Sequence, residues 1–244
     1  MEKVTIPALQ QMKLDGRKIV GVVAWDYQMA QIADRAGVDL ISVGDSVGVN
    51  LWGHATDAEV TVDQMLICCK AVRHGTKRAL LSCDIPNGPA QAGTEDAVRA
   101  AVRLTKEGGA DMVKILGDPG VVKAIVRAGV PVFAELHGEK LSVDKLVGEA
   151  KRLEGAGASV LDFRHSGPVA GPAVVRAVSI PVIGGLGGGP WLDGRVRLAH
   201  TAVGYAAKWI DAKTETYGNA AKLSLDALHA LIDDVRSGRQ IKGG

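Results

Sequence analysis

Four polar residues at or near the ends of short apolar runs could act together in chemistry. Asp45 and Ser46 follow one apolar run and Asp84 follows the next. Lys114 lies inside a third run. In a repeating fold of parallel strands and helices, the carboxyl ends of the strands meet at one rim. Two carboxylates suit a hard divalent cation and an ammonium suits an anionic oxo acid, so metal-assisted chemistry on a small anionic substrate is predicted.

The elements that must position these residues alternate along the chain. Short apolar segments bounded by turn residues are typical of parallel strands covered on both faces. The predicted strands are 19–25, 40–43, 79–83, 112–116, 130–136, 159–163 and 182–184, with an eighth, poorly marked, at 202–205. Amphipathic segments predict helices at 30–36, 63–74, 95–107, 120–128 and 143–154, and a further helix at 219–237.

This alternation predicts an α/β fold, a (β/α)8 TIM barrel with a C-terminal helical extension. A doubly wound sheet alternates in the same way, but polar residues on successive strand ends favour the closed barrel. The length of 244 residues is that of one such barrel, and we expect a single domain over residues 1–244.

Composition narrows the class of protein. Hydrophobic residues make up 47% of the chain, and the formal net charge is only +2, with Lys and Arg scattered. Neither nucleic acid nor a membrane is an expected partner. The three cysteines (Cys68, Cys69 and Cys83) have no metal-ligand spacing, and no apolar run reaches membrane-spanning length. A reduced, cytoplasmic enzyme is the expectation.

A dense set of short motifs runs in order from the N-terminus to about Lys114. They are Thr5-Ile6, Trp25-Asp26-Tyr27, Val43-Gly44-Asp45-Ser46-Val47-Gly48, Gly53-His54, Thr61, Ala71-Val72-Arg73, Asp84 with Pro86, and Met112-Val113-Lys114-Ile115. Together they resemble the ketopantoate hydroxymethyltransferase family, one of the phosphoenolpyruvate/pyruvate-type barrels. The resemblance thins after Lys114 and returns at Ile180-Pro181-Val182-Ile183-Gly184 and Asp193-Gly194.

The resemblance implies roles for individual residues. The family's acids at Asp45 and Asp84 hold Mg²⁺, which chelates a 2-oxo acid, and Ser46 and Lys114 match residues that bind this substrate. The implied reaction is enolisation of the 2-oxo acid followed by hydroxymethyl transfer, with methylenetetrahydrofolate as possible co-substrate. Another divalent cation would suit the same oxygen ligands. Family members assemble into homo-oligomers, which is the expectation here too.

The second half of the chain departs from the family pattern at functional positions. The family's acid two places after the lysine is here Leu116, with Asp118 the nearest substitute. Its histidine after the fifth strand is replaced by Glu135, with His137 two residues on. The glutamate that serves as base matches Asp162, one methylene shorter. That retracts the oxygen by roughly 1.5 Å, and misplacement on this scale can cost on the order of a hundredfold in rate. Asp162 or Glu135 is expected to move the proton.

Other interpretations stay open for the same residues. Asp45 could cap the following helix, and Asp84 before a proline could form a turn. Asp162 could simply pair with Arg164 or His165. At the level of function, an aldolase or lyase of a related 2-oxo acid would keep the same enolate chemistry. A catalytically inactive scaffold is the remaining alternative, although Asp45, Asp84 and Lys114 together argue against it.

Overall fold

A computed structural model describes residues 2–139, 141–211 and 217–243 of the chain. It divides into two compact units, Met1–Arg197 and Leu198–Gly244. The expectation of one domain over residues 1–244 stays a prediction. In the described residues no helix is long and apolar enough to cross a membrane.

The strands form a closed barrel in sequence order, with neighbouring strands parallel. They are β1 (Ile19–Val23), β2 (Leu40–Val43), β3 (Leu80–Asp84), β4 (Met112–Leu116), β5 (Val132–His137), β6 (Val160–Arg164), β7 (Val182–Gly184) and β8 (Gly194–Leu198). The predicted (β/α)8 barrel is therefore confirmed.

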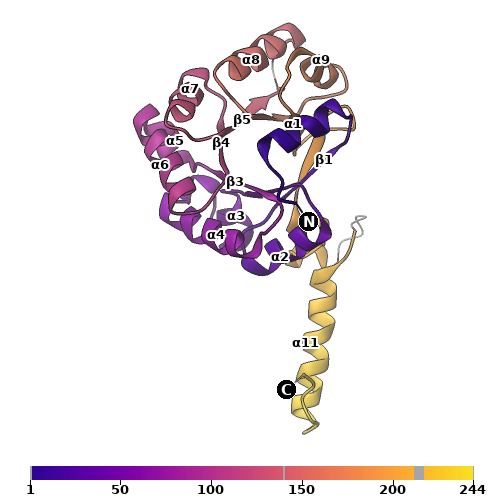
Figure 1. Ribbon diagram of the computed structural model, residues 1–244. Helices are drawn as coiled ribbons and strands as arrows, with labels where there is room; N and C mark the ends of the chain where they lie inside the picture. Colours follow the sequence, from indigo (N-terminus) through magenta and orange to yellow (C-terminus); the bar gives the residue numbers. More distant parts are fainter. Residues whose placement is uncertain (1, 140, 212–216, 244) are drawn as a thin grey trace. The chain divides into compact units, whose positions relative to one another are not determined.

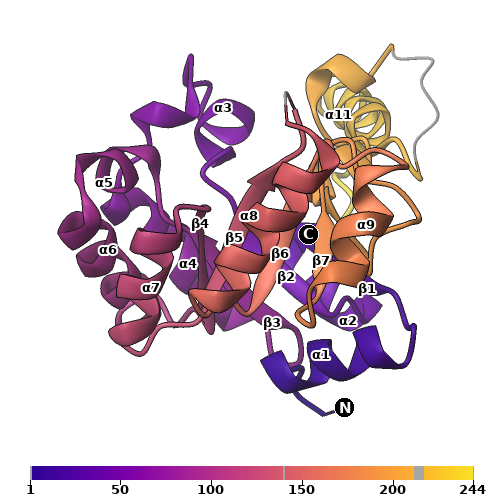
Figure 2. The same ribbon diagram turned by 90° about the horizontal axis from the view of Figure 1, so that it is seen from above.

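Most helices lie around the outside of the strands, and the first one lies across the N-terminal end of the barrel, as Figures 1 and 2 show. They are α1 (Ile6–Leu14), α2 (Tyr27–Ala36), α3 (Val47–Leu51), α4 (Val62–Gly75), α5 (Asn87–Ala92), α6 (Thr94–Lys106), α7 (Pro119–Arg127), α8 (Val143–Gly155) and α9 (Ala170–Ala177), with a 3-10 turn at Asp57–Glu59. Side chains start several of them: Asp26 accepts from Met29 N at 2.8 Å to cap α2, and Thr61 caps α4 in a capping box with Gln64.

The inside of the barrel is filled at its N-terminal end. One apolar side chain from each strand contributes to this core, together with two from α1 and Val4 just before that helix. They are Ile19, Leu40, Leu80, Met112, Phe133, Val160, Ile183 and Val196, with Leu9, Met12 and Val4. Because alternate residues of a strand share a face, residues two positions further along face the interior nearer the C-terminal rim. Ser42 and Ser82 occupy such positions, and their buried hydroxyls hydrogen bond at 2.7 Å.

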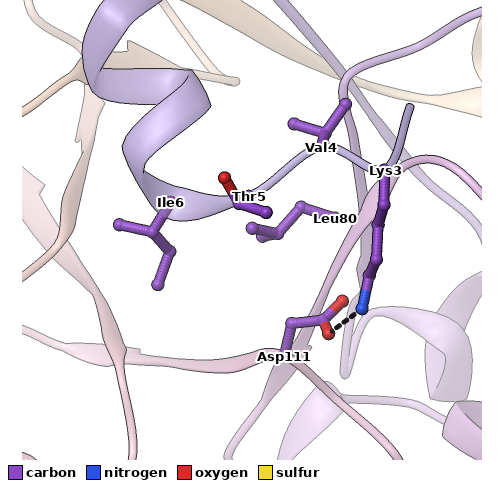
Figure 3. A pocket seen from close by; sticks show the side chains of 6 residues that line it. All are labelled: Lys3, Val4, Thr5, Ile6, Leu80 and Asp111. Atoms are coloured by element: carbon purple, nitrogen blue, oxygen red, sulfur yellow. Dashed lines mark hydrogen bonds and ion pairs between the residues drawn. The ribbon is translucent and has the colours of Figure 1, made fainter.

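A small cavity lies at the N-terminal end of the barrel. It has a volume of about 130 Å³ and is lined by Lys3, Val4, Thr5, Ile6, Leu80 and Asp111. Lys3 Nζ donates to Asp111 Oδ1 at 2.8 Å across its edge (Figure 3). Leu80 begins β3 and Asp111 precedes β4, so this cavity is at the opposite end from the polar residues singled out above.

The eighth strand was predicted in the wrong place. It spans Gly194–Leu198, whereas part of the predicted segment 202–205 closes the short helix α10 (Ala199–Ala202). Arg195 and Arg197 alternate with the inward-facing residues of β8 and are exposed. Because arginines alternate with the inward-facing residues, β8 lacks the continuous apolar run by which the other strands were predicted.

The second unit is helical beyond the end of β8. After α10 it contains a 3-10 turn, Ala207–Trp209, and the long helix α11 (Ala220–Arg236). Asn219 accepts from Lys222 N at 2.9 Å and so caps α11, which confirms the predicted C-terminal helix.

Candidate functional site

Four successive strands of the first unit place charged residues at the C-terminal rim. Asp84 is the last residue of β3, and Lys114 stands opposite it in the register of β4. Glu135 of β5 and Asp162 of β6 are likewise paired in register. Asp45 and Ser46 follow β2 and lead into α3. The structure thus brings the sequence-predicted residues to one end of the barrel.

Lys114 is the centre of this group. Its Nζ lies 3.6 Å from Asp84 Oδ2 and 3.3 Å from Asp162 Oδ2, and it donates a hydrogen bond to Glu135 Oε1. Only 11% of its side chain is exposed, and the ammonium lies 5.9 Å from the centroid of the Phe133 ring. Burial alone lowers the pKa of Lys114, but the three carboxylates reverse this and hold the pKa above its usual range. The side chain therefore remains a cation.

The two oxygens of Asp84 differ in their surroundings: Oδ2 faces Lys114, and Oδ1 does not. Among the described residues, its buried Oδ1 has no hydrogen-bond partner. Burial raises the pKa of Asp84 to about 7; Lys114 opposes this, and the charges of Asp45, Glu135 and Asp162 add to it. A buried carboxylate with an unpaired oxygen and like charges around it is the environment that a cation relieves.

Asp45 shares the same electrostatic setting. Burial raises its pKa; Lys114 counteracts the shift, and Asp57 and Glu135 reinforce it. Gly44 keeps space free beside it, since a Cβ there would lie 3.0 Å from Ser46 Oγ and 3.7 Å from Asp84 Oδ2. Asp45 does not cap α3: the N-cap is Ser46, without a side-chain hydrogen bond.

The donor set fits Mg²⁺. In the described part of the chain, no group of three or more His, Cys, Asp or Glu side chains is arranged to hold a metal ion. Mg²⁺ typically binds through one or two carboxylates and completes its shell with water and substrate oxygens. The carboxylates of Asp45 and Asp84 match that requirement. Among the described residues Asp84 Oδ1 has no hydrogen-bond partner, and the space beside them is one that a side chain at Gly44 would fill.

Glu135 is surrounded by positive or titratable groups. Its Oε2 lies 3.0 Å from His137 Nε2 and 3.4 Å from Arg164 NH1, while Oε1 accepts from Lys114. Burial alone raises the pKa of Glu135, but Lys114, Arg164 and the hydrogen bonds outweigh it and bring the pKa down to about 2. Glu135 is therefore a carboxylate throughout the neutral pH range.

Asp162 is the most buried of the four acids, with 7% of its side chain exposed, against 13% for Asp84 and 14% for Glu135. Its Oδ1 accepts from Gly185 N at 3.4 Å and its Oδ2 faces Lys114. Its ion pair is thus with Lys114, whereas Arg164 pairs with Glu135. The alternative interpretation, in which Asp162 simply forms an ion pair with Arg164, does not match these contacts.

The two residues Leu116 and Asp118, which follow Lys114 in the chain, add no acid to the site. Leu116 ends β4 with a relative exposure of 64%, so an apolar side chain stands at the rim where the family motif has an acid. Asp118 does not replace that acid. Its Oδ1 accepts from Gly120 N at 2.8 Å and from Val121 N at 2.9 Å, which makes it the N-cap of α7.

Sequence comparison points to one family. A family model described as ketopantoate hydroxymethyltransferase matches residues 3–240. The 3-methyl-2-oxobutanoate hydroxymethyltransferase of Cytophaga hutchinsonii is 35% identical over 256 residues, which cover 97% of this chain and 94% of the relative. The protein of the same name from Moorella thermoacetica is 36% identical over 261 residues, covering 97% of this chain and 95% of the relative.

Solved structures share the fold at low sequence identity. A 2,3-dimethylmalate lyase of the PEP mutase/isocitrate lyase superfamily matches with a TM-score of 0.66 and 14% identity, over 100% of this chain and 91% of that one. A phosphonopyruvate hydrolase solved with oxalate and Mg²⁺ matches with a TM-score of 0.62 and 18% identity, over 98% and 89%. Because the family model spans nearly the whole chain and relatives are about 35% identical over almost their full length, this protein is an enzyme of the ketopantoate hydroxymethyltransferase family.

Proposed function

We propose that this enzyme enolises a 2-oxo acid with the help of Mg²⁺ and then joins it to a one-carbon unit, a hydroxymethyl transfer. The observation that carries the proposal is the convergence of Lys114 on three carboxylates, one of them Asp84 with its unpaired oxygen. The names of the relatives support the reaction type, and the oxalate and Mg²⁺ bound by the phosphonopyruvate hydrolase support the ligand class.

The metal would be held by Asp45 and Asp84. When bound, Mg²⁺ supplies a Lewis acid that polarises the keto and carboxylate oxygens of the substrate. Ser46, 3.0 Å from a Cβ placed at Gly44, stands beside this position and binds the carboxylate end. Another divalent cation that favours oxygen ligands would fit the same residues.

Proton abstraction falls to Asp162. It takes the proton from C3 of the substrate; the C–H electron pair forms the C2–C3 double bond, and negative charge moves to the keto oxygen. Lys114 lies 3.3 Å from Asp162 and remains a cation, so it stabilises that charge as it develops. Glu135 is a poor base with a pKa of about 2, so its role is to hold Lys114 in place.

Carbon–carbon bond formation completes the turnover. One water releases the methylene carbon of the donor as formaldehyde and leaves tetrahydrofolate. C3 of the enolate attacks that carbon, the C=O electron pair moves to its oxygen, and the proton held by Asp162 completes the hydroxymethyl group. We propose methylenetetrahydrofolate as the donor, with 3-methyl-2-oxobutanoate as the first acid to test. The predicted homo-oligomer is a further expectation, which sedimentation of the purified protein measures.

A lyase or aldolase acting on a related 2-oxo acid is the second candidate. It is favoured by the changes at the rim: Leu116 is exposed there, and β5 ends at His137 only a short distance in sequence before α8 begins at Val143. An inactive scaffold is disfavoured, because burying Lys114 among three carboxylates without a use for them is costly.

Proton exchange tests the enolising step directly. Purified enzyme with Mg²⁺ and 3-methyl-2-oxobutanoate in deuterated water is expected to remove the C3 proton signal from the NMR spectrum. Asp84→Asn, which keeps the shape and removes the charge, is expected to abolish this exchange. No exchange with any 2-oxo acid would overturn the proposal. Product formed only with methylenetetrahydrofolate would separate transfer from cleavage.

A further inference from the structure

Two side chains of the rim have no part in the proposed reaction. His137 ends β5, Arg164 ends β6, and the two are paired in register. Each lies two residues beyond an acid of the site, Glu135 or Asp162, and therefore faces the same interior of the barrel. The two side chains form a further pair of hydrogen-bonding groups, one inward-facing residue pair closer to the C-terminal rim than Glu135 and Asp162.

Arg164 has hydrogen-bonding capacity to spare. In the described part of the chain its side chain makes a single ion pair, from NH1 to Glu135 Oε2 at 3.4 Å. A guanidinium carries five N–H donors. The side chain is 31% exposed, and that of His137, 3.0 Å from the same Oε2, is 43% exposed. Both are therefore accessible from the open end of the barrel while anchored at its wall.

The ends of these strands are fixed by backbone contacts. Gly138 N donates to Arg164 O at 2.8 Å, and His165 N donates to Leu186 O at 2.7 Å. His165 has φ of 51°, in the left-handed region that non-glycine residues rarely adopt. Gly187 lies against its ring, since a Cβ there would be 2.8 Å from His165 Nδ1. Such strain persists where the surrounding structure enforces it, which is common at ligand sites.

We propose that Arg164, assisted by His137, binds a second anionic group at the far end of the substrate, so that the enzyme acts on a 2-oxo dicarboxylic acid. This inference rests on the proposed function. A substrate held near Asp45 and Asp84 extends toward Asp162, which receives the C3 proton. Arg164 lies two residues further along β6, about 6.6 Å at the rise of a strand. A carboxylate one or two bonds beyond C3 is within reach of its side chain.

An apolar substrate would bind unfavourably beside the guanidinium of Arg164. A hydrocarbon chain placed against Arg164 would cover N–H donors without replacing their water partners, which is unfavourable. A carboxylate can accept two parallel hydrogen bonds from a guanidinium. The simpler interpretation is that Arg164 only balances the charge of Glu135. The two interpretations differ in whether Arg164 distinguishes one substrate from another.

A matched pair of substrates makes that distinction. We would compare 2-oxopentanedioate with 2-oxopentanoate, which has the same chain length and lacks the distal carboxylate, in the Mg²⁺-dependent C3 exchange assay. For the wild-type enzyme, kcat/KM is expected to be on the order of tenfold or more higher for the diacid. In Arg164→Ala the ratio is expected to fall to about one, with Arg164→Lys in between. Arg127→Ala, on the exposed surface of α7, controls for the loss of one positive charge.

Binding gives a readout that does not depend on turnover. Calorimetric titration with Mg²⁺ present is expected to show tighter binding of 2-oxopentanedioate than of 2-oxopentanoate, and loss of that difference in Arg164→Ala. A wild-type ratio near one, or an equal fall for both substrates in the variant, would overturn this inference while exchange itself upheld the proposed function. If neither 2-oxo acid nor 3-methyl-2-oxobutanoate exchanged, the proposed function would fail and this inference with it.

Discussion

Lys114 Nζ lies 3.3 Å from Oδ2 of Asp162, so the cation on β4 and the base proposed on β6 meet inside the barrel across the intervening strand β5. As Asp162 takes a proton, its own negative charge disappears and charge builds on the substrate oxygen. The ammonium of Lys114 then stabilises the negative charge on the substrate oxygen in place of the charge on Asp162, and it needs little movement to do so. The remaining contacts of the ammonium, with Glu135 and Asp84, keep it in place during that change.

Asp162→Asn is expected to lower the exchange rate by about 10²- to 10⁴-fold, the usual contribution of a positioned general base. The amide keeps the shape of the side chain but cannot accept the proton. Asp162→Glu restores the longer acid of the family motif and is expected to keep measurable exchange. NMR exchange kinetics and a thermal melt of each variant would be recorded together. Full activity in Asp162→Asn would remove this residue from the mechanism.

Glu135→Gln is expected to lower kcat for exchange by on the order of tenfold or more, with a smaller effect on KM, because loss of its charge frees the ammonium of Lys114 to shift. Restoration of part of the activity in Glu135→Asp would fit a positioning role. Glu139→Gln is the matched control, since Glu139 is 57% exposed and contacts His165 rather than Lys114. Equal effects of the two amide substitutions would contradict the role given to Glu135.

Asp45→Asn and Asp84→Asn are each expected to weaken Mg²⁺ binding by at least tenfold, because each removes a charged oxygen ligand. Calorimetric titration of Mg²⁺ into the protein without substrate measures this independently of activity. Asp57→Asn controls for the loss of one nearby negative charge without the loss of a proposed ligand. Asp57 acts on Asp45 electrostatically, while its own Oδ1 accepts a hydrogen bond from Asn87 at 3.3 Å. Unchanged Mg²⁺ affinity in both site variants would exclude these residues as ligands.

Asp34→Asn tests the fold away from the site. Its carboxylate accepts from the backbone N–H groups of Lys77, Arg78 and Ala79, which ties α2 to the chain entering β3. Burial raises the pKa of Asp34, but these bonds and the charge of Arg78 outweigh it, so the folded pKa is lowered. The substitution is expected to cost about 1–3 kcal/mol in unfolding free energy at neutral pH.

The sign of the pH dependence follows from the lowered pKa of Asp34. Its stabilising effect is complete above the pKa of the unfolded chain and is lost as the pH falls through the folded pKa. The difference in urea-unfolding free energy between the wild type and Asp34→Asn is therefore expected to shrink on acidification from neutral pH. A difference that grew instead would show that the hydrogen bonds to Asp34 do not favour its charged form.

The sequence by itself determined the alternation of strands and helices and the rim residues, because the apolar runs of buried parallel strands are local features. Asp84 and Lys114 could be assigned to one rim from their places in those runs. The position of strand β8 could not be predicted in this way, because its arginines break the apolar run. Only its pairing with β7 identifies it as a strand.

Only the tertiary structure decided which charges pair. Glu135 holds Lys114, Arg164 turns to Glu135 rather than Asp162, and Asp118 caps α7 instead of joining the site. Each of these outcomes depends on the register between strands and on how far a strand end stands from the next helix. Spacing along the chain does not encode those distances, since residues far apart in sequence become neighbours only when the barrel closes.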